Sequence, residues 1–259
     1  MLSLIKLYCS IAQKTKRLAA RYLQLINPLL SPKKFFHLSR KFEPFLYISF
    51  IISLSYGLIG GLFLAPSDYL QGDGFRIIYI HVPAAFLSLF VYSIMALTAL
   101  LGTIFRLKLC FLVMKHSAPI GAVFTFLALI TGSLWGKPMW GTWWIWDARL
   151  TSQFILLFLY LGIILFQSAI LHKKNHERII AILVMVGFID IPIIHYSVYW
   201  WNTLHQGATL KMFEPSTIAP VMFYPLLAMI FSFLIYYAIV LFLRINYDLI
   251  HNQAKFHWL

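Results

Sequence analysis

Long apolar runs alternate with short polar segments along most of the chain. Six of these runs are long enough to cross a bilayer, because about 20 helical residues span the roughly 30 Å hydrocarbon layer. They cover residues 45–64, 80–105, 117–135, 151–171, 179–198 and 219–243. The pattern therefore predicts an all-α integral membrane protein with six transmembrane helices.

Basic residues are distributed unevenly between the polar segments. Because six spans return the chain to its starting side, the segments form two sets, and these hold seventeen and four Lys and Arg. Cytoplasmic segments of membrane proteins carry the excess of positive charge, so we expect both termini in the cytoplasm. The loops 65–79, 136–150 and 199–218 are then expected on the outer side.

The same pattern divides the chain into three parts. Residues 1–42 hold nine Lys and Arg and no acid, and we interpret them as a basic cytoplasmic N-terminal segment. Residues 43–243 form the six-helix membrane domain, and residues 244–259 a short cytoplasmic tail. An organelle-targeting presequence is also basic and poor in acids, so this alternative for the first segment stays open.

Composition narrows the possible functions. The 259 residues are 61% hydrophobic and 11% charged, which is typical of a protein embedded in lipid. The net charge of +13 follows the membrane topology rather than one soluble face, so we expect membrane lipid and no nucleic acid as a partner. Cys9 and Cys110 are isolated, which argues against a redox pair or a zinc site. The chain also has no phosphate-binding loop of the G-x-x-x-x-G-K-[ST] type, so nothing suggests nucleotide hydrolysis.

Tryptophans are concentrated in one outer segment, between predicted helices three and four. This segment holds five of the eight tryptophans and ends in an acid and a base, Asp147 and Arg149. Its tryptophans are Trp135, Trp140, Trp143, Trp144 and Trp146. An aromatic belt at the membrane surface would place one or two indoles at helix ends on both faces. The crowding on one face favours a binding surface instead.

Three of the nine histidines fall on the same outer side: His81, His195 and His205. His81 and His205 belong to different segments on one membrane face, as two axial ligands of a planar metal macrocycle require. His195 lies inside the end of the fifth run and is interpreted as a packed, structural residue. Asp190 lies deeper in that run, and either a function or a protonated or paired state explains it equally well.

Together these residues favour capture of heme. Indoles cover an apolar macrocycle, imidazoles bind its iron, and cations pair with its two propionates. The outer cations near the candidate site are Arg76, Lys137 and Arg149. Asp147 either orients Arg149 or caps a helix that begins at residue 148. We expect heme b with His81 and His205 as axial ligands.

Three motifs resemble the CcmC family, heme-handling membrane proteins of cytochrome c maturation. One is the tryptophan-rich signature W-G-T-W-W-I-W-D at residues 140–147, which follows G-S-L-W-G-K-P-M. The others are R-I-I-Y-I-H-V-P-A-A, which contains His81, and P-I-I-H-Y-S-V-Y-W-W-N-T-L-H-Q-G, which contains His205. The three occur in the family's order, and the resemblance extends from about residue 45 to 243.

The resemblance implies a specific role in the bacterial inner membrane. Heme would be held at the periplasmic face by His81 and His205, contacted by the tryptophan-rich loop, and passed to the heme chaperone CcmE. Further implied partners are the small protein CcmD and the CcmA–CcmB ATPase. Arg76, Asp147 and Arg149 match family positions in the region of heme and chaperone contact. The protein would be an assembly factor rather than an enzyme.

Two other functions were weighed. A b-type cytochrome that transfers electrons would bury its ligands within the spans, often with a second heme across the membrane, and no comparable histidine pair occupies the inner half. A heme channel or transporter would need a polar route at mid-membrane, for which Asp190 alone is insufficient.

Overall fold

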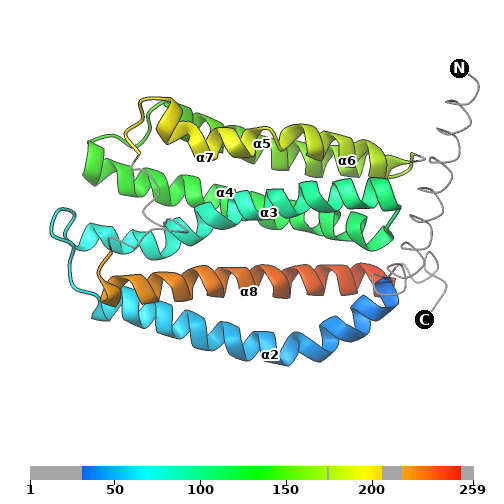
Figure 1. The fold of residues 1–259 in the computed structure, drawn as a ribbon, viewed down its shortest axis with the longest axis horizontal. Helices are drawn as coiled ribbons and strands as arrows, with labels where there is room; N and C mark the ends of the chain where they lie inside the picture. Colours follow the sequence, from blue (N-terminus) through cyan, green and yellow to red (C-terminus); the bar gives the residue numbers. More distant parts are fainter. Residues whose placement is uncertain (1–30, 174, 206–217, 252–259) are drawn as a thin grey trace, which may run out of the picture.

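The computed structural model describes residues 31–173, 175–205 and 218–251 and shows a bundle of long helices (Figure 1). Within these described residues, six helical stretches are long and apolar enough to cross a membrane, which confirms the predicted fold class. The elements are α2 (Pro32–Ile59), η1 (Gly60–Leu64), η2 (Asp73–Ile77), α3 (Ile78–Phe105), α4 (Lys108–Trp140), α5 (Ala148–Ala169), α6 (His176–Gly187), α7 (Asp190–Trp200) and α8 (Pro220–His251). The described residues contain no strand.

The first helix begins well before its apolar run. The Ser31 hydroxyl accepts a hydrogen bond from the Lys34 amide (3.3 Å), and Pro32 occupies the first helical position, where its missing N–H costs nothing. α2 therefore starts at Pro32 and carries basic residues ahead of the span expected from residue 45. At its other end it continues as the short π-helix η1. Residues 1–30 of the expected basic segment lie outside the described residues.

The third spanning helix, α4, continues into the segment that was expected to be an outer loop. α4 runs through Trp140, so Trp135 and Lys137 are helical and the prediction of a loop over 136–150 is wrong in its extent. The helix ends at Gly141, whose φ of +77° places it in the left-handed region that glycine adopts without strain. Its amide donates to the Lys137 carbonyl oxygen at 3.0 Å. Only residues 141–147 connect α4 to α5.

The fifth span is broken in the middle. It was expected as one run over 179–198, but α6 ends at Gly187 and α7 begins at Asp190. Pro192 explains the break, because a proline removes one helical hydrogen bond and its ring collides with the carbonyl four residues earlier, here that of Phe188. Asp190 is buried at the first turn of α7.

The helices form layers around the α3–α4 pair. α3 packs most extensively against α4, and α2 packs against α8 (Figure 1). Tyr160 of α5 crosses the core and donates its hydroxyl to the Ser88 carbonyl oxygen at 2.7 Å. It passes α4 at Gly121, where a β-carbon would collide with the tyrosine ring.

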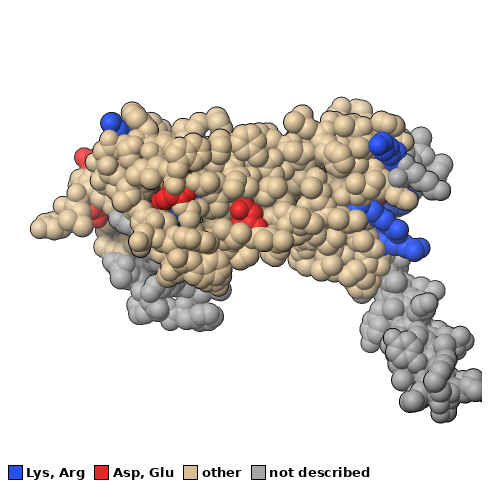
Figure 2. All heavy atoms as spheres, turned by 90° about the horizontal axis from the view of Figure 1, so that it is seen from above, with Lys and Arg blue, Asp and Glu red and all other residues tan. Residues whose placement is uncertain are grey.

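The two ends of the bundle differ in charge. The start of α2 and the end of α8 lie at the same end, as an even number of spans requires (Figure 1). Lys and Arg gather at this end, which we call the basic end (Figure 2). The opposite end carries His81 and Trp140 and is called the tryptophan end. The assignment of the basic end to the cytoplasm stays a prediction.

Candidate functional site

Two histidines that are far apart in the sequence meet at the tryptophan end. His81 lies in the first turns of α3, and His205 follows α7. Their ring centroids are 6.4 Å apart, with an angle of 39° between the rings. An imidazole nitrogen binds a metal at about 2 Å, so two imidazoles on opposite sides of one iron have centroids on the order of 6 Å apart. The observed spacing fits heme iron held between them.

A hydrogen bond to Thr131 of α4 selects the proton position on His81. The Thr131 hydroxyl donates to the Leu127 carbonyl oxygen at 2.7 Å, and its oxygen lies 3.0 Å from His81 Nδ1. Because the Leu127 carbonyl oxygen is the nearer acceptor for the single hydroxyl proton, we infer that the Thr131 oxygen accepts the proton of Nδ1. This leaves Nε2 of His81 with a free lone pair, the form in which an imidazole binds metal.

Two of the five tryptophans lie beside the histidine pair. The Trp135 ring meets the His81 ring edge to face, with centroids 5.6 Å apart. Trp140, also on α4, lies 6.4 Å from His205. The Trp135 indole is fixed by donating its Nε1–H to Gln71 Oε1 at 2.9 Å. α4 therefore places an indole beside each candidate ligand.

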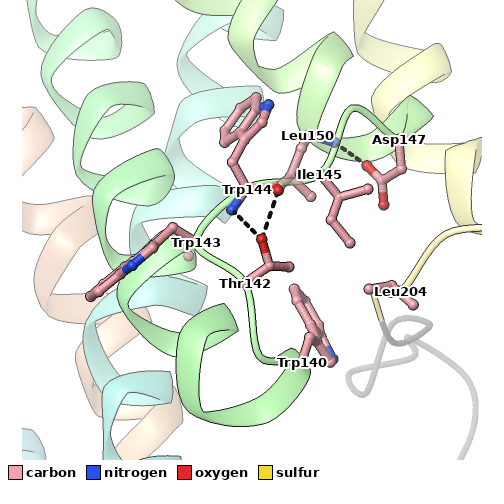
Figure 3. A pocket seen from close by; sticks show the side chains of 9 residues that line it. Trp140, Thr142, Trp143, Trp144, Ile145, Asp147, Leu150 and Leu204 are labelled. Carbon is pink, nitrogen blue, oxygen red and sulfur yellow. Dashed lines mark hydrogen bonds between the residues drawn. The ribbon is translucent and has the colours of Figure 1, made fainter.

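Trp143 and Trp144 point in different directions from the 141–147 connection (Figure 3). The Trp144 and Trp146 rings contact each other at 5.4 Å, and both contact Phe154 of α5. Trp143 lies 5.9 Å from the Lys137 ammonium in a cation–π contact. These indoles thus extend the aromatic surface toward α5 and solvent, whereas the sequence suggested one common platform.

A shallow pocket adjoins the site between α4, the 141–147 connection and Leu204 (Figure 3). Two of its lining residues hold buried polar atoms without a hydrogen-bond partner among the described residues, Trp144 Nε1 and Asp147 Oδ2. Buried polar groups are nearly always paired, so these atoms are candidates for contacts with a ligand. Gly132, which also lines the pocket, leaves room for His81, whose Cε1 lies 3.0 Å from where a β-carbon would be.

Asp147 and Arg149 hold the end of this connection. Asp147 Oδ1 accepts the Leu150 amide proton at 2.8 Å and caps α5, which begins at residue 148, so the capping prediction is confirmed. Arg149 does not pair with Asp147 within 4 Å. Its Nη1 donates to the Ile194 carbonyl oxygen of α7 at 2.9 Å. The pair therefore joins the loop to α5 and α7.

Arg76 connects the two segments on either side of the loop between η1 and η2. Its two terminal nitrogens donate to the carbonyl oxygens of Gly61 and Ala65, each at 2.9 Å, and Nε donates to Asp73 at 3.1 Å. The guanidinium thus ties η1 to η2. Its proposed contact with a heme propionate has no support in these bonds.

Sequence reasoning missed several residues and misplaced others. Thr131 and Gln71 orient His81 and Trp135, but no local pattern identifies partners 50 and 64 residues away. His195, expected to be packed, is exposed, and its ring meets the ring of its neighbour Tyr196 edge to face, with centroids 4.8 Å apart. His116, to which the sequence analysis gave no role, is buried and bonds to Asp248 at 2.9 Å.

The donor set suits heme better than a bare metal ion. Among residues 31–173, 175–205 and 218–251, no group of three His, Cys, Asp or Glu side chains is arranged to hold a metal. Heme needs only one or two protein ligands, because its porphyrin supplies the others. Fold and site together define a multi-pass membrane protein of the heme-handling class.

Comparison with known proteins specifies the family. The family model described as CcmC, heme exporter protein C, matches residues 25–259, so the chain belongs to the CcmC family. Heme exporter protein C of Escherichia coli strain K12 is 45% identical over 233 residues, which cover 90% of this chain and 94% of that protein. The same-named protein of Bradyrhizobium diazoefficiens is 41% identical, with 88% and 86% covered. A putative cytochrome c biosynthesis ccmC-like mitochondrial protein of Arabidopsis thaliana is 41% identical, with 80% and 78% covered. The family handles heme in cytochrome c maturation.

Proposed function

We propose that this protein binds heme b at the periplasmic face of the bacterial inner membrane and delivers it to the heme chaperone CcmE. The observation that carries the proposal is the 6.4 Å spacing of His81 and His205, with an indole beside each ring. The role is that of an assembly factor, and CcmD and the CcmA–CcmB ATPase are its further partners.

Each residue has a distinct task in this proposal. His81 would hold the iron through Nε2, because Thr131 occupies Nδ1, and His205 would be the second iron ligand. Trp135 and Trp140 pack beside the porphyrin, while Trp143, Trp144 and Trp146 cover the adjoining surface. Bound heme supplies an iron that accepts both imidazoles and propionates that accept hydrogen bonds. Trp144 Nε1 is one donor for a propionate, and Arg149 in the first turn of α5 is a candidate cation.

Exposure of the site suits transfer rather than permanent storage. Trp143 and Trp146, next to the site, are 55% and 72% exposed, so the described protein leaves this surface open for an acceptor protein in the proposal. A cofactor that is passed on needs such an open edge, whereas an electron-transfer heme is normally enclosed. The proposal therefore favours handover over a b-type cytochrome.

The ligand assignment is tested by the optical spectrum of the protein purified in mild detergent. Replacing both His81 and His205 by Ala is expected to abolish the Soret band, because iron loses both axial ligands. His195→Ala is the matched control, since this histidine lies at the same end but is exposed on α7. Undiminished heme content in the double variant would refute the assignment.

Export of heme across the bilayer is a second candidate, because the relatives are named heme exporters. The buried acid Asp190 beside the break in the fifth span is the observation in this chain that favours it. Liposomes that contain only this protein distinguish the two functions. Heme accumulation inside them without an ATPase would favour export.

A further inference from the structure

The loop between η1 and η2 carries an unusual apolar tip. We call residues 66–72 the Tyr69 loop. Tyr69 is 97% exposed and Leu70 is 85% exposed, more than any other large hydrophobic side chain that the structure describes. The loop projects beyond the ends of the helices at the tryptophan end (Figure 1, cyan). Adjacent exposed apolar side chains on a loop beyond the helix ends indicate an interaction surface.

The Tyr69 loop is held in one conformation by its own hydrogen bonds. Asp68 and Gly72 pair in both directions, with N–O distances of 3.1 and 3.0 Å. Asp68 Oδ1 also accepts the amide protons of Leu70 at 2.9 Å and Gln71 at 2.8 Å. Gly72 has a φ of +55°, which suits glycine. A rigid tip loses little conformational entropy when it binds.

A hydrogen bond joins this loop to the candidate heme site. Gln71 Oε1 accepts the Trp135 indole proton at 2.9 Å, and the Trp135 ring contacts His81. Gln71, at the base of the loop, is therefore connected to the proposed iron ligand His81 through Trp135. A protein that binds the tip would lie beside the heme site.

Charge specifies the kind of partner. The segment 66–75 contains two of the chain's eight acids, Asp68 and Asp73, and no base. The Asp73 side chain is 72% exposed, although it also pairs with Arg76 at 3.1 Å. A partner that fits this surface has an apolar pocket with Lys or Arg at its rim. Anionic lipid headgroups lack the pocket and would be repelled by the acids.

We propose that the Tyr69 loop is the docking surface for the water-soluble domain of the heme acceptor. This inference rests on the proposed function, because it assumes that heme leaves the site to another protein. Tyr69 and Leu70 insert into the acceptor's apolar pocket, and the acids meet its basic rim. Docking at this point places the acceptor next to Trp135 and the open edge of the site.

The test measures binding of purified water-soluble CcmE domain to the full-length, heme-loaded protein in nanodiscs. Tyr69→Ser/Leu70→Ser is expected to weaken binding roughly tenfold or more, as for exposed anchors at an interface, and to leave the Soret band unchanged. Leu171→Ser is the matched control, because Leu171 is 53% exposed at the opposite, basic end. Wild-type affinity and wild-type heme transfer in the double variant would overturn the docking proposal alone. Failure of the unmodified protein to load the chaperone would instead refute the proposed function, and docking with it.

A second measurement separates protein docking from contact with lipid. Leu70→Cys, in a background of Cys9→Ser and Cys110→Ala, is labelled with a polarity-sensitive dye. A blue shift on addition of the CcmE domain supports docking. A blue shift caused by the lipid bilayer alone, with no change on addition of the domain, would assign the tip to the membrane surface and overturn the proposal.

Discussion

Replacing Thr131 by Val tests whether α4 prepares His81 for iron. Val has nearly the same shape as Thr but cannot accept the Nδ1 proton, whose distance to the Thr131 oxygen is 3.0 Å. Because Thr131 is buried, water does not readily replace the lost partner. The His81 ring then loses both its fixed proton position and its orientation.

Two independent estimates of the free energy lost with this hydrogen bond agree. Removing a hydrogen-bond partner of a metal-binding histidine typically lowers affinity about 10- to 100-fold, which corresponds to about 1.4–2.8 kcal/mol. Leaving a buried donor unsatisfied costs about 1–3 kcal/mol. We therefore expect Thr131→Val to weaken heme binding by roughly one to two orders of magnitude.

The assay is titration of the protein with heme, followed by the Soret band, together with the midpoint potential of the bound heme. Loss of the Nδ1–H bond makes the imidazole a weaker electron donor to iron, so the potential is expected to rise. Thr131→Ser keeps the hydroxyl and is expected to retain most of the affinity.

Thr125→Val separates this effect from a general effect on the helix. The Thr125 hydroxyl donates to the Gly121 carbonyl oxygen at 2.7 Å in the same helix and is likewise buried. If Thr131→Val keeps wild-type affinity and potential, or if Thr125→Val changes both by the same amounts as Thr131→Val, the proposed role of Thr131 is refuted.

Two further predictions concern the connection between α4 and α5. Asp147→Ala removes the cap of α5 and is expected to reduce the free energy of unfolding by about 1 kcal/mol, measured by thermal or denaturant unfolding in detergent, whereas Asp147→Asn keeps a capping oxygen. Equal stability of the Ala variant and the wild type would contradict the capping role. Alkaline phosphatase fused after Trp140 is expected to be active, because the tryptophan end is assigned to the periplasm. A fusion that is inactive, while a cytoplasmic reporter is active at the same point, would reverse the topology and move the site to the cytoplasm.

The sequence by itself determined the membrane fold and the residue types of the site. Hydrocarbon offers no partner for backbone polar groups, so a spanning segment must be a long apolar helix, and such helices are visible as runs of apolar residues. Pro192 shows the limit of this reasoning. It breaks the fifth span between α6 and α7, but the apolar run continues through the break, so the run alone does not indicate it. The end of α4 was misplaced for a related reason: indoles at a membrane surface suit a helix as well as a loop.

Only the tertiary structure decided which candidate residues meet. His81 contacts a partner 124 residues later in the chain, His205, and its proton position depends on Thr131. The tertiary structure also shows that Trp135 and Trp140 lie beside the histidines, whereas Trp144 and Trp146 pack on Phe154. The length of an apolar run indicates how long a helix is. Contacts between residues of different helices depend instead on the rotation and crossing angle of those helices when their side chains pack. That information belongs to pairs of distant residues, and no single stretch of the sequence contains it.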